Sequence, residues 1–149
     1  MGTMNTGLFE NEFMRVVVPD RWLAFLAIDC EGKASPKKLH IYKDIKLETD
    51  IFTHVGITVC YYEKAYLGNL LREFYDDIID ITPFKKGNYT WKGFLCKSMG
   101  YPYIMLETCN EYDKFLVMIL MQNGEYQLNF QDEDVQIILN SIIGLGDKV

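Results

Sequence analysis

The sequence is poor in the residues and motifs from which catalytic sites are usually built. It has two histidines, His40 and His54, in 149 residues, and contains no P-loop, G-x-G-x-x-G, G-x-S-x-G or H-E-x-x-H pattern. Each histidine lies in a strand-like stretch, with no catalytic partner that the sequence identifies. A Cys–His pair that meets only in the folded chain stays open as an alternative. We therefore expect no catalytic residue, no cofactor and no metal ligand, and predict that the protein is not an enzyme.

Paired cysteines are also missing. Cys30, Cys60, Cys96 and Cys109 form no C-x-x-C pair, and none has a histidine at zinc-site spacing. Cys60 and Cys96 lie in apolar stretches, where a thiol packs as a small hydrophobe and its pKa rises. Reduced structural thiols are the favoured interpretation, and one or two disulfides are the alternative. Because free thiols persist in reducing compartments, the sequence predicts a cytoplasmic location.

Long apolar runs and a recognisable leader are absent too. No stretch approaches the roughly 18 apolar residues of a membrane-spanning helix, and residues 1–7 lack the basic and apolar regions of a signal peptide. If Met1-Gly2-Thr3 ahead of Met4 is a cloning remnant, a native leader has been trimmed away and the protein would be exported. Residues 1–7 are predicted to be a flexible N-terminus ahead of a single domain over 8–145.

Basic residues are outnumbered, with 15 Lys and Arg against 21 Asp and Glu and a net charge of −6. Nucleic-acid binders normally carry a basic stripe, so no nucleic-acid partner is expected. Hydrophobic residues make up 49% of the chain, which is enough to build a folded core.

The most informative stretch lies near the carboxyl end. Residues 115–121 are apolar at every position, which predicts a central strand buried on both faces. Residues 122–124, Gln-Asn-Gly, predict a hairpin turn. Apolar and polar side chains alternate over 126–130, which predicts a partner strand with one solvent-exposed face. Residues 132–143 begin with three acidic side chains, which are favourable at the start of a helix. The apolar residues that follow have the spacing of an amphipathic helix, and Gly144 is predicted to end it.

The remaining segments complete an α+β prediction. Strands are expected at 13–18, 22–28, 39–43, 54–61, 89–96 and 101–108. Residues 31–38 are expected to be an exposed loop, 44–52 irregular, and 63–79 an amphipathic helix that does not continue past Pro83. Short turns join the four strands from Tyr89 to Phe130, which predicts an antiparallel meander packed against both helices.

Two groups of side chains are candidate binding surfaces. Glu73, Asp76, Asp77 and Asp80 would share one face of the expected helix. A solvated face, a partner-facing acidic patch and a metal site are the three interpretations of that face. The second group consists of tyrosines, which suit both sheet packing and binding surfaces. They are Tyr61, Tyr62, Tyr66, Tyr101 and Tyr103.

The order of parts resembles the PsbP-like fold family. The strand 13–18 followed by Pro19-Asp20-Arg21-Trp22 is similar to the opening of that family, and the strand at Trp91–Phe94 and the helix at 134–142 are similar to its later parts. The resemblance implies an antiparallel sheet sandwiched between helices in an α-β-α arrangement. The family includes a Ran-binding nuclear-transport factor of the Mog type, an extrinsic photosystem subunit and bacterial lipoproteins, so it implies a bacterial member of unknown function. Its members share no catalytic residues that would carry over.

These observations favour a non-enzymatic protein-binding module, for example an immunity or assembly factor, with another protein as its partner. The alternative is a small-ligand carrier or enzyme with a pocket between sheet and helix. A deep cavity lined by convergent polar groups would favour the alternative, whereas a shallow apolar patch rimmed by acids would favour protein binding. A purely structural role in a larger assembly is the third possibility.

Overall fold

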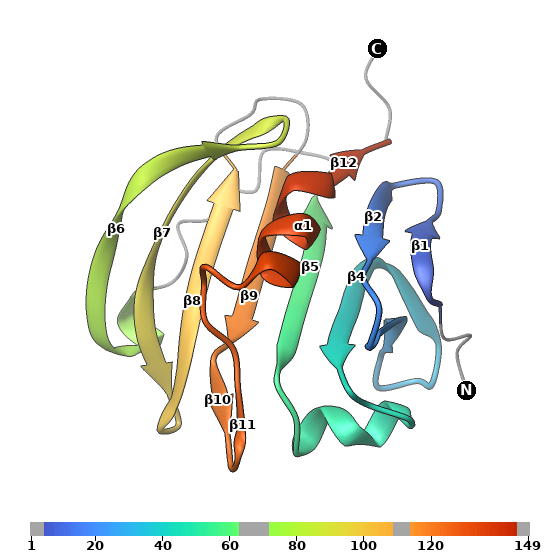
Figure 1. Ribbon diagram of the computed structural model, residues 1–149, viewed down its shortest axis with the longest axis horizontal. Coiled ribbons are helices and arrows are strands. Elements are labelled where there is room, and N and C mark those ends of the chain that lie inside the picture. The colour runs from blue at the N-terminus through green and yellow to red at the C-terminus, as the bar shows by residue number, and fades with distance from the viewer. Residues whose placement is uncertain (1–4, 63–71, 109–113, 146–149) are drawn as a thin grey trace.

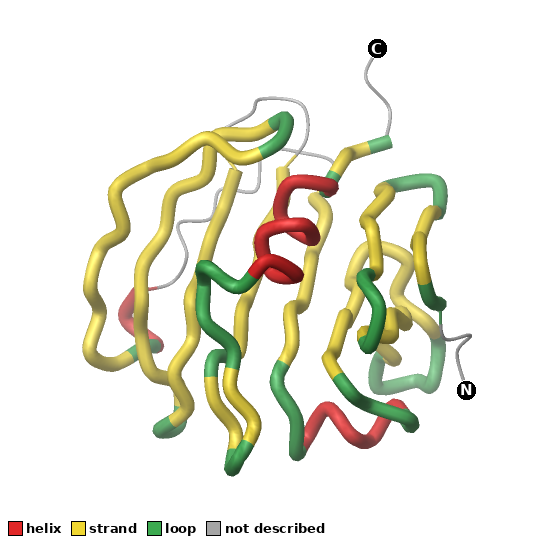
Figure 2. The backbone as a smooth tube through the Cα atoms, in the orientation of Figure 1, coloured by secondary structure: helices red, strands yellow, loops and turns green. Residues whose placement is uncertain are grey.

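The computed structural model describes residues 5–62, 72–108 and 114–145 (Figures 1 and 2). Over these residues a seven-stranded antiparallel sheet has the strand order β3-β4-β5-β9-β8-β7-β6. A three-stranded sheet, β1-β2-β12, and a two-stranded hairpin, β10-β11, accompany it. The protein is therefore dominated by antiparallel β-structure.

The bounds of the elements are as follows. The strands are β1 (Gly7–Glu10), β2 (Met14–Val18), β3 (Trp22–Ile28), β4 (Ala34–Lys43), β5 (Gly56–Tyr62), β6 (Asp76–Lys86), β7 (Tyr89–Ser98), β8 (Tyr101–Thr108), β9 (Lys114–Leu120), β10 (Gln122–Asn123), β11 (Tyr126–Gln127) and β12 (Ile143–Gly144). The helices are the 3₁₀ turns η1 (Glu48–Phe52) and η2 (Arg72–Phe74) and the α-helix α1 (Glu133–Ser141).

Strand β9 is the centre of the large sheet, as the all-apolar stretch 115–121 predicts. It pairs with β5 along one edge and with β8 along the other, both antiparallel. Phe115, Val117 and Ile119 point into one core and are buried, and Leu116 and Met118 are half-buried on the opposite face. A strand that packs on both faces needs apolar side chains at consecutive positions, which is the pattern that the sequence carries.

One face of the large sheet, the first face, is covered by α1 and the small β1-β2-β12 sheet (Figure 1). The helix begins and ends close to where its periodicity predicts, and it buries Val135, Ile138 and Leu139. These residues pack with Trp22 and Trp91 from β3 and β7. A nine-residue helix is too short to be stable alone in water, so tertiary packing on this face must hold it.

The predicted sandwich between helices is wrong. Among the described residues α1 is the one α-helix. On the opposite face of the large sheet, the second face, the described packing comes from Tyr75, which follows the short turn η2, from Ile78, and from Ile51 of η1. Part of the expected helix 63–79, residues 63–71, lies outside the described residues. Its remainder forms η2 and the start of β6, and none of the described helices is long and apolar enough to span a membrane.

Strand β6 replaces the end of that expected helix because its residues are well suited to a sheet edge. Ile78, Ile79, Ile81 and Thr82 are β-branched, and β-branched side chains favour strands. Pro83 lacks an amide hydrogen, and an edge strand tolerates this because one side of its backbone has no partner. The pairing of β6 with β7 is irregular on either side of residues 79–81, which is typical of protected edges.

Two further expectations are corrected. Residues 126–130 do not pair with 115–121 as a strand, because β5 and β8 already occupy both edges of β9. They form the short β11 and then lead into α1, and Leu128 enters the core. Residues 31–38 are not all loop, since β4 begins at Ala34. Within residues 1–7, Asn5 exchanges backbone hydrogen bonds with Ala24 and Gly7 begins β1.

Candidate functional site

The second face carries a row of side chains that crosses five strands of the large sheet, from β4 to β7. In the strand register, His40 lies opposite Thr58, Thr58 opposite Met118, Met118 opposite Met105, and Met105 opposite Phe94. Side chains that are directly opposite each other point to the same face of a sheet. The row is polar at the β4 end and apolar toward β7.

A pocket of about 240 Å³ lies over this row, and we call it the sheet-face pocket. Met105 and Met118 form its apolar floor, while Tyr42, Tyr75 and Tyr103 contribute aromatic walls. This volume is small for a binding pocket. It is therefore suited to a ligand smaller than the drug-sized molecules that fill pockets of ~300–1,000 Å³.

The position of Tyr42 depends on Gly56 across the strand pair. Tyr42 and Gly56 are directly opposite in the β4–β5 register. A Cβ atom added to Gly56 would collide with the ring of Tyr42, so the ring occupies the space above the glycine. Glycine is thus required at residue 56 for close packing, and it lets Tyr42 lie buried at the edge of the pocket.

His40 is held as a neutral imidazole at the polar end of the row. Its Nδ1 lies 2.9 Å from Oγ1 of Thr58, and its ring packs against Phe25 and the edge of Tyr42. Burial, with a smaller contribution from the positive charge of Lys38, lowers the pKa of His40 from 6.5 to about 4. At neutral pH the side chain therefore offers hydrogen bonds without a charge.

The tyrosines of the pocket are likewise uncharged. Burial raises the pKa of Tyr42 to about 12; the neighbouring Tyr103 adds to this increase, and the Thr58 side chain opposes it as a hydrogen-bond partner. Burial also raises the pKa of Tyr103. Both phenols keep their protons at neutral pH and remain able to donate hydrogen bonds.

Within the lining that the structure describes, Lys38 is the one charged side chain. It is exposed and lies two residues before His40 on the same face of β4. Lys38 makes no ion pair with any of the described residues. Glu107 is a carboxylate that lies in register with Lys38 across the sheet. It is three strands, roughly 14 Å, from Lys38 and pairs with Lys92 at 3.4 Å.

The register places Cys60 diagonal to His40 on the same face of β4 and β5, so this histidine and this cysteine are neighbours. Burial lowers the pKa of His40 and raises the pKa of Cys60, which does not suit a base and its nucleophile at neutral pH. His54 is stacked on Tyr126 at 4.1 Å between ring centroids, whereas His40 lies in the sheet-face pocket. Cys60 and Cys96 are buried free thiols whose pKa values burial raises, Cys96 to about 11. Cys30 is also free and is exposed. Cys109 lies outside the described residues.

The acidic group does not share a helical face. Asp77 and Asp80 lie on β6 and make ion pairs with Lys97 and Arg72, at 3.8 and 2.6 Å. No cluster of three or more potential metal-binding side chains occurs within the described part of the chain. The partner-facing acidic helix is therefore replaced by an ion-paired strand edge.

The predicted tyrosine surface is divided between different parts of the fold. Tyr61 is in the main core, Tyr62 is half-buried, and Tyr101 is exposed. Tyr103 lines the sheet-face pocket, and Tyr66 lies outside the described residues. Tyr42 and Tyr75, which the sequence did not single out, are the other aromatic residues of the pocket.

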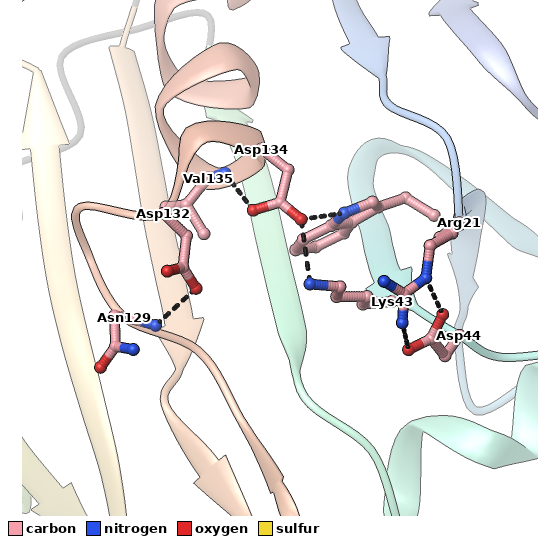
Figure 3. Close-up of polar contacts among 8 residues, drawn as sticks. Arg21, Lys43, Asp44, Asn129, Asp132, Asp134 and Val135 are labelled. Atoms are coloured by element: carbon pink, nitrogen blue, oxygen red, sulfur yellow. Dashed lines mark hydrogen bonds and ion pairs between the residues drawn. The ribbon is translucent and has the colours of Figure 1, made fainter.

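A second polar cluster anchors the helix rather than forming a binding site (Figure 3). At the start of α1, Asp134 accepts hydrogen bonds from Trp22 Nε1 at 2.9 Å and from Val135 N at 2.9 Å, and pairs with Lys43 at 3.1 Å. Burial alone would raise the pKa of Asp134, but these donors together lower it. The helix start is thus tied to β3 and β4 by a carboxylate that stays ionised.

Beside this cluster, a hollow of about 440 Å³ is bordered by Arg21 and Asp44. The two side chains make a paired interaction, with Arg21 Nε and Nη2 at 2.9 and 2.7 Å from the carboxylate oxygens of Asp44. Both residues have positive φ, 75° and 59°. The pair ties the connection before β3 to the segment after β4, so its polar groups are already satisfied.

No protein-family model matches this chain, and no curated protein matches its sequence. Membership of the PsbP-like family therefore stays a prediction, while the helix-sheet-helix sandwich that it implied is wrong. The candidate site rests on the geometry of the chain itself.

Sequence reasoning missed the sheet-face pocket because its residues come from five strands. A weak signal was present in the apolar stretch 54–61, where Thr58 is a hydroxyl residue among buried neighbours. His40 sits at an equivalent alternate position of the preceding strand. Only the register places these two residues next to each other and over the methionines.

Proposed function

We propose that this protein is a non-enzymatic binding protein that holds a small molecule in the sheet-face pocket. The observation that carries the proposal is the combination of an apolar floor, Met105 and Met118, with neutral hydrogen-bonding groups. Small-molecule sites typically combine an apolar surface with a few placed polar groups. This favours the small-ligand alternative over protein binding, with the pocket on the face opposite the helix.

Binding without chemistry is supported by the protonation states around the pocket. A general base works best when its pKa lies near the operating pH, and the pKa of His40 is well below that range. The neighbouring thiol, Cys60, has a raised pKa and therefore little thiolate character at neutral pH. The lining described by the structure includes no carboxylate.

The test is an NMR titration of protein labelled with ¹³C at the methionine methyl groups, with indole as the aromatic probe. Ring currents from bound indole are expected to shift the methyl signals of Met105 and Met118. The methyl signal of Met14, which is fully buried in the core on the first face, is the internal control. If Met105 and Met118 do not shift at millimolar indole, or if Met14 shifts equally, the proposal is wrong.

A matched pair of variants tests the polar end of the pocket. Thr58→Val removes the hydroxyl beside His40 and keeps the side-chain shape, so it is expected to weaken binding of hydrogen-bonding probes several-fold. Thr82→Val makes the same change at an exposed site on β6 and should leave binding unchanged. Equal effects of the two variants would contradict the assignment of the pocket.

A second candidate function, docking of another protein, is favoured by the turn between β7 and β8. Met99 at this turn is 92% exposed with a φ of 52°, a conformation that glycine or asparagine usually adopts. Phe74 is also largely exposed, and the pairing of Asp76 with Lys97 brings its segment near the turn. A partner captured by the wild-type protein and lost with Met99→Asn would support docking, whereas a partner retained by Met99→Asn would contradict it.

A further inference from the structure

We infer that the ligand of the sheet-face pocket is a small aromatic carboxylate whose negative charge pairs with Lys38. This inference rests on the proposed function, because it names the chemical class that the same pocket would take. Three features of the pocket carry it: its charge, its aromatic and thioether surface, and the order of these features along it.

The charge of the pocket is positive although the chain has a net charge of −6. Lys38 is the one ionised side chain of the described lining, and it has no ion-pair partner among the described residues. Its charge reaches both His40 and Cys60: it adds to the lowering of the His40 pKa by burial, and it opposes the rise that burial gives the Cys60 pKa. A ligand anion would therefore meet one unpaired cation and no opposing carboxylate in the described lining.

The surface of the pocket favours an aromatic ring over an aliphatic body. Tyr75 and Tyr103 stand at the β7–β8 side, and their rings can stack with a planar ligand. Met105 and Met118 form the floor, and thioether sulfurs make favourable contacts with aromatic rings. A ring placed over the methionines would contact both kinds of group at once.

The order of these groups fixes the orientation of the ligand. Lys38 and His40 lie on β4, while the methionine floor lies on β9 and β8, two and three strands farther along. At about 4.8 Å per strand, the charged end and the floor are separated by roughly 10–14 Å between backbones, which the long lysine side chain shortens. The carboxylate is thus placed toward Lys38 and the imidazole of His40, with the ring toward Tyr103.

The experiment compares three probes by calorimetric titration of the intact protein. Indole-3-acetate carries the ring and the charge, tryptophol carries the same ring with a neutral hydroxyl, and cyclohexaneacetate carries the charge without an aromatic ring. Indole-3-acetate is expected to bind about three- to tenfold more tightly than either of the others, since a partly exposed ion pair contributes modestly. The preference over tryptophol should shrink in 0.5 M NaCl because salt screens exposed charges.

Two charge-matched variants locate the cation. Lys38→Gln is expected to abolish the preference for indole-3-acetate over tryptophol. Lys37→Gln changes the net charge equally but alters the neighbouring residue, which packs over Phe13 on the first face, so it should keep the preference. The NMR signals of Met105 and Met118 report in every case whether the probe occupies the pocket.

The outcomes separate this inference from the proposed function. If none of the three probes shifts Met105 and Met118, the proposed function fails and the inference fails with it. If tryptophol binds the pocket as tightly as indole-3-acetate, or if Lys38→Gln keeps the preference, the pocket binds ligands but the anionic class is wrong. If cyclohexaneacetate equals indole-3-acetate, the aromatic part is wrong.

Discussion

Replacing Asp134 with asparagine tests whether the start of α1 is held by its contact with β3 and β4. The carboxylate oxygen Oδ2 accepts from Trp22 Nε1 and from Lys43 Nζ, while Oδ1 accepts from Val135 N. Asparagine has one acceptor oxygen, so its amide group must face either Val135 N or the pair formed by Trp22 and Lys43. At least one donor then loses its acceptor.

The expected cost follows from the burial of the donors. Trp22 is 1% exposed, and an unsatisfied buried donor costs about 1–3 kcal/mol. The Lys43 side chain is 23% exposed, so loss of its ion pair adds up to about 1 kcal/mol. Asp134→Asn should therefore lower the free energy of unfolding by about 1–4 kcal/mol. Urea denaturation, followed by circular dichroism at pH 7, measures this difference.

Glu133→Gln is the matched control, because it removes a negative charge from the same helix turn without a buried partner. It should cost at most about 0.3–1 kcal/mol, from the helix dipole. Trp22→Phe completes a double-mutant cycle, and in its background Asp134→Asn should cost about 1–2 kcal/mol less than in wild type. The reasoning is refuted if Asp134→Asn costs no more than Glu133→Gln, or if the cycle shows no coupling.

Two further predictions concern the core and the pocket. Leu139→Ala should lower the free energy of unfolding by about 2–5 kcal/mol, because Leu139 is fully buried on the inner side of α1. Ile137→Ala on the exposed side of the same helix should lower it much less. An unchanged urea midpoint for Leu139→Ala would show that the helix is peripheral. His40 has a folded-state pKa of about 4 against 6.5 when unfolded, so its contribution to stability is complete above pH 6.5 and is lost as the pH falls toward 4. From pH 7 to pH 5 the wild type should therefore lose about 1–2 kcal/mol more stability than His40→Gln, and equal losses would contradict the burial of a neutral His40.

Local patterns determined the elements in which the residues themselves carry the signal. The all-apolar stretch 115–121 could only be accommodated by a strand with two packed faces, and it became β9 at the centre of the sheet. The acidic start and apolar spacing of 132–143 likewise produced α1 nearly at its predicted bounds. In both cases the segment's own periodicity specifies the surface that it must bury.

Segments with weak or mixed periodicity were decided by their neighbours. Residues 76–79 fitted the end of a helical pattern, but in the structure they begin β6 and pair with the edge of β7. Backbone hydrogen bonds and β-branched side chains both favour this pairing. Residues 126–130 had the alternation of a strand, yet both edges of β9 were taken by β5 and β8. Whether a strand edge is free for pairing depends on the assembled sheet, so the sequence of a single segment does not show it.

The candidate site belongs wholly to this second category. The sequence by itself determined that β4, β5, β8 and β9 would be apolar enough to form a sheet, and that His40 and Thr58 would be polar residues within it. Only the strand register, which aligns His40 with Thr58 and Thr58 with Met118, placed the polar pair beside the methionine floor. A shift of one residue in that register would send those side chains to the opposite face. The pocket is therefore a consequence of long-range pairing, which no local pattern encodes.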